Sequence, residues 1–221
     1  MSDSRPLFTD AEREAIRSAV SAAEQRTAGE IVPYVVRQSA SYPGAVWRSA
    51  SAGALVLGLV ILVVGALYSG WAWAWLYTPP AIVAAMTAGG ILGALLTRIE
   101  AVRRFTAGAA EMEQAVHRRA AVAFVEEEVF DTRDRTGILL FVSLLEHRIE
   151  VVGDAGINAK VEHEEWVEVV DLIRDGVRSK TLASGLMAAI ERCGDLLHRR
   201  GVTIRPDDTD ELPDDVRVRD E

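Results

Sequence analysis

One long uncharged region that holds two apolar runs dominates the pattern of polar and apolar positions along this chain. No Asp, Glu, Lys or Arg occurs between Ser49 and Thr97. The hydrocarbon core of a bilayer is spanned by about 20 apolar residues in a helix. The pattern therefore predicts two transmembrane spans, at about 49–68 and 75–97, within a hairpin region that we place at 45–104.

Aromatic and small residues give this hairpin further detail. The stretch that joins the spans and leads into the second carries Trp71, Trp73, Trp75 and Tyr77, and such rings favour the interface between membrane and water. In the second span, Gly89 and Gly93 form a GxxxG pair of the kind that allows two helices to approach closely. Chance spacing in a helix rich in glycine and alanine explains the same pair.

Arginines flank the hairpin on one side only. Arg37 and Arg48 precede the first span, Arg98, Arg103 and Arg104 follow the second, and the segment between the spans has no Lys or Arg. Because positive charge is retained in the cytoplasm, we expect a multi-pass protein of the plasma (inner) membrane with both termini cytoplasmic. The first residues lack a basic start followed by an apolar stretch, so we expect no secretion signal.

The residues before the hairpin, 1–44, predict a helix and a strand. Thr9 to Glu12 reads as a capping box, and the helix that it starts should stop near Gly29. A strand follows at Glu30–Val36. Because Pro33 has no N–H for a strand ladder, the pattern favours an edge or bulged position for this strand.

The residues after the hairpin, 105–204, predict the rest of an α/β domain. Thr106–Val125 has one apolar stripe and predicts a single amphipathic helix. Ile138–Leu145 is continuously apolar, as in a strand buried on both faces, and Ile149–Val152 should pair with it as a hairpin. Helices around Trp166, ending near Gly176, and from 182 to 197 complete a two- or three-layer fold.

Charge and cysteine content exclude several classes of function. The formal net charge is −9, which argues against contact with nucleic-acid phosphates. Most of it lies in an acidic tail at 205–221, which has few apolar residues and predicts disorder or only local order. The single cysteine, Cys193, excludes an internal disulfide and a cysteine-based zinc site. Its apolar helical surroundings favour packing over reactivity.

Acidic residues at the strand ends are the candidate site. Asp131 and Asp134 precede the central strand, and Asp154 follows the next one. Carboxylate oxygens are ligands for hard cations such as calcium or magnesium, so these three residues are the candidate metal ligands. Aspartates also cap and brace turns without any metal, and the acids at 162–165 suit the start of a helix in the same way.

Several segments together resemble the TPM domain family, in its bacterial membrane-bound branch. In 131–143 a polar loop leads through a glycine into an apolar strand, and in 148–157 a second strand ends in a glycine-containing turn. The other segments that carry the resemblance are the helices at Trp166 and 186–197, the early strand 29–33 and the tail 210–216. The resemblance implies an α/β/α sandwich. Some family members are reported as phosphatases, some bind calcium, and others act in repair or assembly of membrane complexes.

Two functions compete on these grounds. The first is a non-catalytic adaptor or assembly factor, in which the hairpin anchors a domain that binds a membrane protein or a divalent cation; a homo-oligomer stays open. The second is a phosphatase, in which carboxylates hold a metal that polarises a phosphoryl oxygen. Transport is the least supported function, because the spans hold no charged residue to form an ion path.

Overall fold

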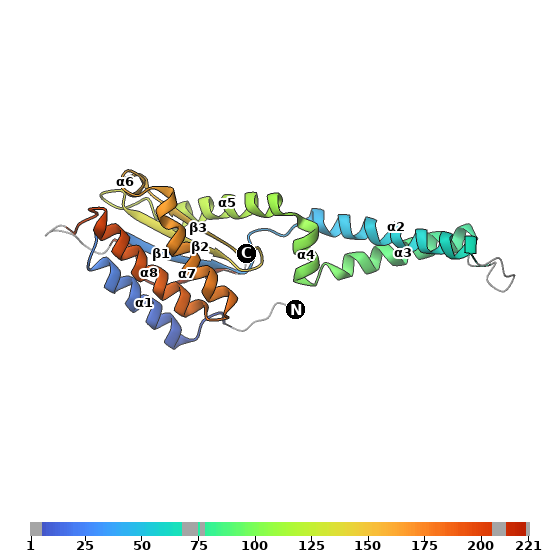
Figure 1. Ribbon diagram of the computed structural model, residues 1–221, viewed down its shortest axis with the longest axis horizontal. Helices are drawn as coiled ribbons and strands as arrows, with labels where there is room; N and C mark the ends of the chain where they lie inside the picture. The colour runs from blue at the N-terminus through green and yellow to red at the C-terminus, as the bar shows by residue number, and fades with distance from the viewer. Residues whose placement is uncertain (1–5, 68–74, 76–77, 205–210, 220–221) are drawn as a thin grey trace. The chain divides into compact units, whose positions relative to one another are not determined.

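A computed structural model describes residues 6–67, 75, 78–204 and 211–219 of the chain (Figure 1). The chain divides into two compact units. The first combines residues 1–40 with 113–221, and the second comprises residues 41–112. The second unit begins before the hairpin region expected at 45–104 and ends after it.

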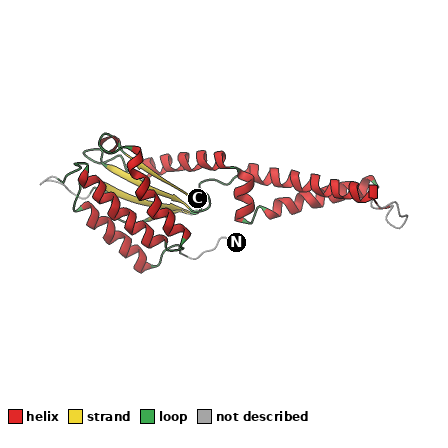
Figure 2. Ribbon diagram, in the orientation of Figure 1, coloured by secondary structure: helices red, strands yellow, loops and turns green. Residues whose placement is uncertain are grey.

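A four-stranded mixed sheet organises the first unit (Figure 2). The strands are β1 (Glu30–Val36), β2 (Gly137–Ser143), β3 (Arg148–Gly153) and β4 (Arg217–Arg219), in the order β3-β2-β1-β4. β1 runs parallel to both β2 and β4, whereas β2 and β3 are antiparallel. The predicted hairpin of two strands after the central loop is therefore confirmed.

The first strand lies inside the sheet, although Pro33 itself has a neighbouring strand on one side only among the described residues. β1 lies between β2 and β4, and Pro33 is in register with Leu140 of β2. β4 pairs only with Tyr34–Val36. On that side the sheet ends before Pro33, so an interior strand can hold a residue that lacks an N–H.

Part of the acidic tail at 205–221 is ordered, which fits the alternative of local order. Its last described residues form β4, and Leu212 and Val216 are buried. The carboxylate of Glu30 accepts hydrogen bonds from the backbone N–H groups of Glu211 and Leu212. Leu212, Val216 and the buried carboxylate of Glu30 thus hold this segment against the α/β unit, although its overall composition is that of a solvated tail. Residues 205–210 and 220–221 lie outside the described part.

Helices cover both faces of the sheet (Figures 1 and 2). On one face, α1 (Asp10–Glu24), α7 (Val167–Arg178) and α8 (Leu182–Arg199) share a core with alternate residues of β1 and β2. On the other, α5 (Ala109–Glu126) packs on the intervening residues, among them Tyr34 and Phe141, whose rings stack at 5.7 Å between centroids. The prediction that β2 is buried on both faces is confirmed.

Local signals place several helix ends. The capping box at the start of α1 is confirmed, since Thr9 Oγ1 accepts from the Glu12 N–H and Glu12 accepts from the Thr9 N–H. α7 follows a short 3-10 helix, η2 (His163–Trp166), and ends at Arg178, near the expected end at Gly176. Gly176 also allows α7 to cross α8 closely, because a Cβ there would lie 2.8 Å from the Cα of Gly185.

The second unit contains two long helices and a short one. These are α2 (Pro43–Leu67), α3 (Pro79–Leu96) and α4 (Glu100–Ala107). The single helix expected at Thr106–Val125 is wrong at its start, because Gly108 has a φ of +85° and separates α4 from α5. Of the aromatic residues between the spans, Trp75 is described and exposed, whereas Trp71, Trp73 and Tyr77 lie outside the described residues.

Candidate functional site

The outer surface of the helical hairpin is the most apolar surface that the structure describes. Both α2 and α3 are long and apolar enough to cross a membrane, as judged by length and composition, and only 11% of each apolar stretch is buried. Large aliphatic side chains of both helices point away from the contact between them. They include Leu55, Val56, Leu59, Val60, Leu62, Val63 and Leu67 on α2, and Val83, Ile91, Leu92, Leu95 and Leu96 on α3.

Glycines form the contact between these two helices. Gly89 and Gly93 of α3 are its buried residues. A Cβ on Gly89 would lie 2.9 Å from the Cβ of Leu57, and a Cβ on Gly93 would lie 2.8 Å from the carbonyl carbon of Ser49. The GxxxG pair noted in the sequence therefore lies in the helix–helix contact, where the two backbones meet without intervening side chains.

One arginine joins the short helix to the hairpin. Arg48 of α2 donates from Nη2 to the carbonyl oxygen of Ala107, at 3.0 Å, and to Glu111 Oε2, at 2.7 Å. Ala107 is the last residue of α4 and is buried. The guanidinium thus satisfies a carbonyl at the end of a helix, where no intrahelical donor is available, and fixes α4 against α2.

The candidate metal ligand Asp154 already forms an ion pair with an arginine. It is 5% exposed, and Arg135 donates to both of its carboxylate oxygens, at 2.6 Å from Nε and 3.0 Å from Nη2. This hydrogen-bonded pairing raises the pKa of Arg135. Asp154 is also the N-cap of α6 (Ala155–Asn158), since its Oδ1 accepts from the Ala155 N–H at 2.7 Å.

The predicted metal ligands do not form a metal-binding group. Within the described residues, which include Asp131, Asp134 and Asp154, no set of three or more His, Cys, Asp or Glu side chains could hold an ion. The physical reason lies at Asp154, whose oxygens are used by Arg135 and by a helix start. Nearby, a Cβ on Gly156 would lie 2.7 Å from the Arg135 carbonyl oxygen, so this glycine provides space for the loop rather than a ligand-binding turn.

A buried polar cluster that sequence reasoning missed lies where parallel strands β1 and β2 end. Ser143 donates to the carboxylate of Glu146, Ser39 Oγ lies 2.8 Å from Ser143 Oγ, and the Ser39 N–H donates to Glu146 Oε1 at 2.9 Å. A serine bound to a carboxylate suggests base-assisted chemistry. However, Ser143 is 1% and Glu146 4% exposed, so the cluster is placed to brace the turn rather than to meet a substrate. Its sequence signal is only Ser-x-x-Glu after a strand.

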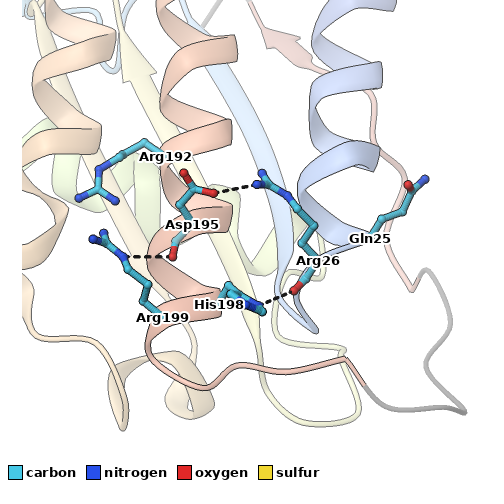
Figure 3. A pocket seen from close by; sticks show the side chains of 6 residues that line it. All are labelled: Gln25, Arg26, Arg192, Asp195, His198 and Arg199. Atoms are coloured by element: carbon cyan, nitrogen blue, oxygen red, sulfur yellow. Dashed lines mark hydrogen bonds and ion pairs between the residues drawn. The ribbon is translucent and has the colours of Figure 1, made fainter.

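An open recess of about 490 Å³ lies between the end of α1 and α8 (Figure 3). Its lining includes three arginines, Arg26, Arg192 and Arg199, against one acid, Asp195. Arg26 Nη1 pairs with Asp195 Oδ1 at 2.7 Å, and Arg199 donates from Nε to the Asp195 carbonyl oxygen at 3.3 Å. Arg192 also pairs with Glu168, and in Figure 3 the guanidinium of Arg26 lies beside Asp195, apart from those of Arg192 and Arg199. Guanidinium groups suit a carboxylate or a phosphate. The pattern was invisible in the sequence because residues 25–26 and 192–199 meet only in the fold.

The remaining sequence candidates have structural roles. Cys193 is fully buried and burial raises the pKa of its thiol, which matches the packing interpretation. Among the acids at 162–165, Glu165 accepts from the Glu162 N–H at 3.0 Å and pairs with Arg200. The backbone hydrogen bond first, and the arginine second, lower the pKa of Glu165. These acids cap the start of a helix, which matches the interpretation of 162–165 that needs no metal.

The fold defines a mixed α/β protein with an additional unit of apolar helices. No protein-family profile matches the chain, and no match is found among curated proteins. Among solved structures, the chain is similar to the NMR structure of the BA42 protein from the psychrophilic bacterium Bizionia argentinensis, with a TM-score of 0.60 and 19% sequence identity. The alignment covers 99% of this chain and 100% of that one. At this identity the likeness concerns the fold alone.

Proposed function

We propose that this chain is a membrane-anchored protein of the TPM type, in which α2 and α3 cross the plasma membrane as a hairpin and the α/β/α domain serves as a non-catalytic adaptor or assembly factor for membrane proteins. The observation that carries the anchor is the exposed apolar surface of α2 and α3. The order of segments around β2 and β3, with helices on both faces of the sheet, supports the TPM interpretation.

The exposed surface is energetically incompatible with water. Burial of one large aliphatic side chain contributes about 1.5–3 kcal/mol. Twelve such side chains, Leu55, Val56, Leu59, Val60, Leu62, Val63, Leu67, Val83, Ile91, Leu92, Leu95 and Leu96, are exposed on the two helices. Leaving them in water would cost on the order of 10 kcal/mol, which is comparable to the whole stability of a domain. Lipid removes that cost, because acyl chains are as apolar as these side chains.

Arginines give the anchor an orientation. Arg48 lies in the first turns of α2, and Arg98, Arg103 and Arg104 follow α3, so all four flank the same end of the hairpin. Positive charge is retained on the cytoplasmic side of membranes. In our proposal this end of the hairpin, both termini and the α/β unit are cytoplasmic.

The recess beside α8 is our candidate contact for a protein partner. Arg26 pairs there with Asp195 and Arg192 with Glu168, whereas Arg199 donates to a backbone carbonyl. The charge of Arg199 therefore favours an acidic group on the partner. No comparable observation favours the phosphatase. Asp154, its best candidate ligand, is occupied by Arg135, and within the described residues no group of acids could hold the metal that the reaction needs.

A substitution in the middle of α2 tests the anchor. Leu59 is 62% exposed, and an arginine at such a depth costs about 2.5–3.5 kcal/mol on insertion scales. We expect Leu59→Arg to impair insertion and to increase the share of protein that sodium carbonate extracts from membranes, whereas the matched variant Leu59→Ala remains in the membrane. If the wild-type protein is itself extracted by carbonate, the proposal is wrong.

Site-specific photo-crosslinking in native membranes tests the adaptor role. A photoreactive residue at Arg199 should crosslink to a membrane protein, and the charge reversal Arg192→Glu should reduce that product. Arg118 is a matched control, since it is an exposed arginine of α5 on the opposite face of the sheet. If neither position crosslinks, or if both give the same product, the recess is not the contact.

A further inference from the structure

The short helix α4 turns its apolar side outward. Phe105 is 88% exposed and Ile99, its N-cap residue, is 53% exposed. Successive helical residues are about 100° apart, so Ala101, Val102 and Phe105 share one side of the helix. The buried residue Ala107 lies on the opposite side. A soluble protein would place this apolar side in its core, so an apolar environment is expected to cover it.

Contacts within the same unit place this apolar side at one end of the hairpin. Arg48 of α2 holds the last carbonyl group of α4, through the 3.0 Å hydrogen bond to Ala107. The neighbouring residue Trp47 is 74% exposed. Two large aromatic side chains, Trp47 and Phe105, are therefore exposed at the same end of the hairpin, as in the aromatic belts of membrane proteins.

Cationic groups accompany the aromatic ones. Arg98, Arg103 and Arg104 lie within seven residues, with Glu100 as the one acid among them. Within the described residues, the Nε of Arg103 is buried and lacks a hydrogen-bond partner. A basic helix with exposed apolar side chains suits the surface of an anionic bilayer, where arginines meet phosphates and aromatic rings enter the acyl boundary.

We propose that α4 is an interfacial helix that lies in the headgroup layer of the cytoplasmic leaflet and binds anionic phospholipid. Figure 1 shows α4 crossing the end of the hairpin at a steep angle to α2 and α3. A helix in that position runs along the bilayer surface when the hairpin spans the bilayer. The inference rests on the proposed membrane anchor and adds a lipid partner to it.

An environment-sensitive fluorophore at Phe105 tests this placement in the full-length protein. Phe105→Cys would be labelled with a nitrobenzoxadiazole dye and reconstituted into nanodiscs of phosphatidylcholine with or without phosphatidylglycerol. Cys193 is fully buried and should not react in the folded protein. Val167→Cys is the matched control, because Val167 is an apolar residue with 57% exposure in the α/β unit.

The result expected at Phe105 is strong quenching by nitroxide-labelled lipid and several-fold weaker quenching by aqueous iodide than at Val167. The lipid quenching should increase with phosphatidylglycerol, and replacing the three arginines with glutamine should remove that increase. If iodide quenches both positions equally while the protein still resists carbonate extraction, this inference is wrong and the anchor stands. Protection from iodide without quenching by lipid would indicate a protein contact at α4 and would equally overturn it.

Discussion

Gly53 of α2 packs directly against the carbonyl group of Gly89 of α3, with no side chain between the two backbones. This contact lets two apolar helices associate through backbone packing, which is the main source of helix association in lipid. A methyl group on Gly89 would lie 2.9 Å from the carbonyl carbon of Gly53.

We therefore expect Gly89→Ala to weaken the hairpin by about 1–3 kcal/mol, the usual cost of overpacking. The neighbouring substitution Gly90→Ala is the control, since its Cβ would meet nothing closer than 3.5 Å. Titration with dodecyl sulfate in mixed micelles, followed by energy transfer between labels on α2 and α3, measures the difference. Equal stability of the two variants would show that the helices are not packed as described.

The pair formed by Arg135 and Asp154 should matter to the stability of the α/β unit. Arg135→Ala leaves a buried carboxylate without its cation, and Asp154→Ala removes the N-cap of α6. Because the arginine side chain is 55% exposed, solvent screens its charge. We therefore expect Asp154→Ala to lose about 1–2 kcal/mol, in the range of a lost cap, and Arg135→Ala to lose less. Thermal unfolding of the variants and of the double variant measures this; additive losses would mean that the two residues are not coupled.

Calcium should not stabilise the wild-type protein. The oxygens of Asp154 are occupied by Arg135, so an ion would have to displace a bidentate guanidinium. Thermal unfolding with and without millimolar calcium should therefore give the same midpoint. A rise in the midpoint that saturates with calcium concentration would restore the metal site predicted from the sequence.

Stability should fall as pH rises through the titration of His117. Its Nδ1 lies 2.6 Å from Glu150 Oε1, and this hydrogen bond, together with the charge of Glu150, raises the pKa of His117. A raised folded pKa stabilises the fold in full below the unfolded value of about 6.5, and that contribution is lost as pH rises through the folded pKa. Unfolding midpoints across this range should decline for the wild type and stay flatter for His117→Gln. Parallel curves for the two proteins would exclude the coupling.

Local sequence patterns were sufficient to predict several elements. The Thr9–Glu12 capping box fixed the start of α1, and the unbroken apolar run from Ile138 predicted a strand buried on both faces. The two long helices α2 and α3 were evident from their length and lack of charge. The cap is formed by neighbours in sequence. The burial of β2 comes from helices that are distant in sequence, so the apolar run indicates the burial but not the partners.

Features that depend on distant partners were missed. Val216 enters the core in a tail whose average composition predicts solvation. The negative charge of Asp154 suggested that it binds a metal ion. Asp154 instead binds the guanidinium of Arg135, 19 residues earlier in the chain. The recess between α1 and α8 needs residues from both ends of the α/β unit. A break at Gly108 was also missed, because a glycine is tolerated inside a helical pattern until its φ is known.

The membrane hairpin is tested most directly by the accessibility of single cysteines in intact spheroplasts that express the full-length protein. Ser69→Cys lies between the two spans in sequence, and Glu128→Cys lies in the α/β unit. With a membrane-impermeant maleimide added outside, we predict labelling of position 69 at once and of position 128 only after permeabilisation. Labelling of position 69 only after permeabilisation, with the protein recovered in the soluble fraction, would show that the hairpin does not cross the membrane.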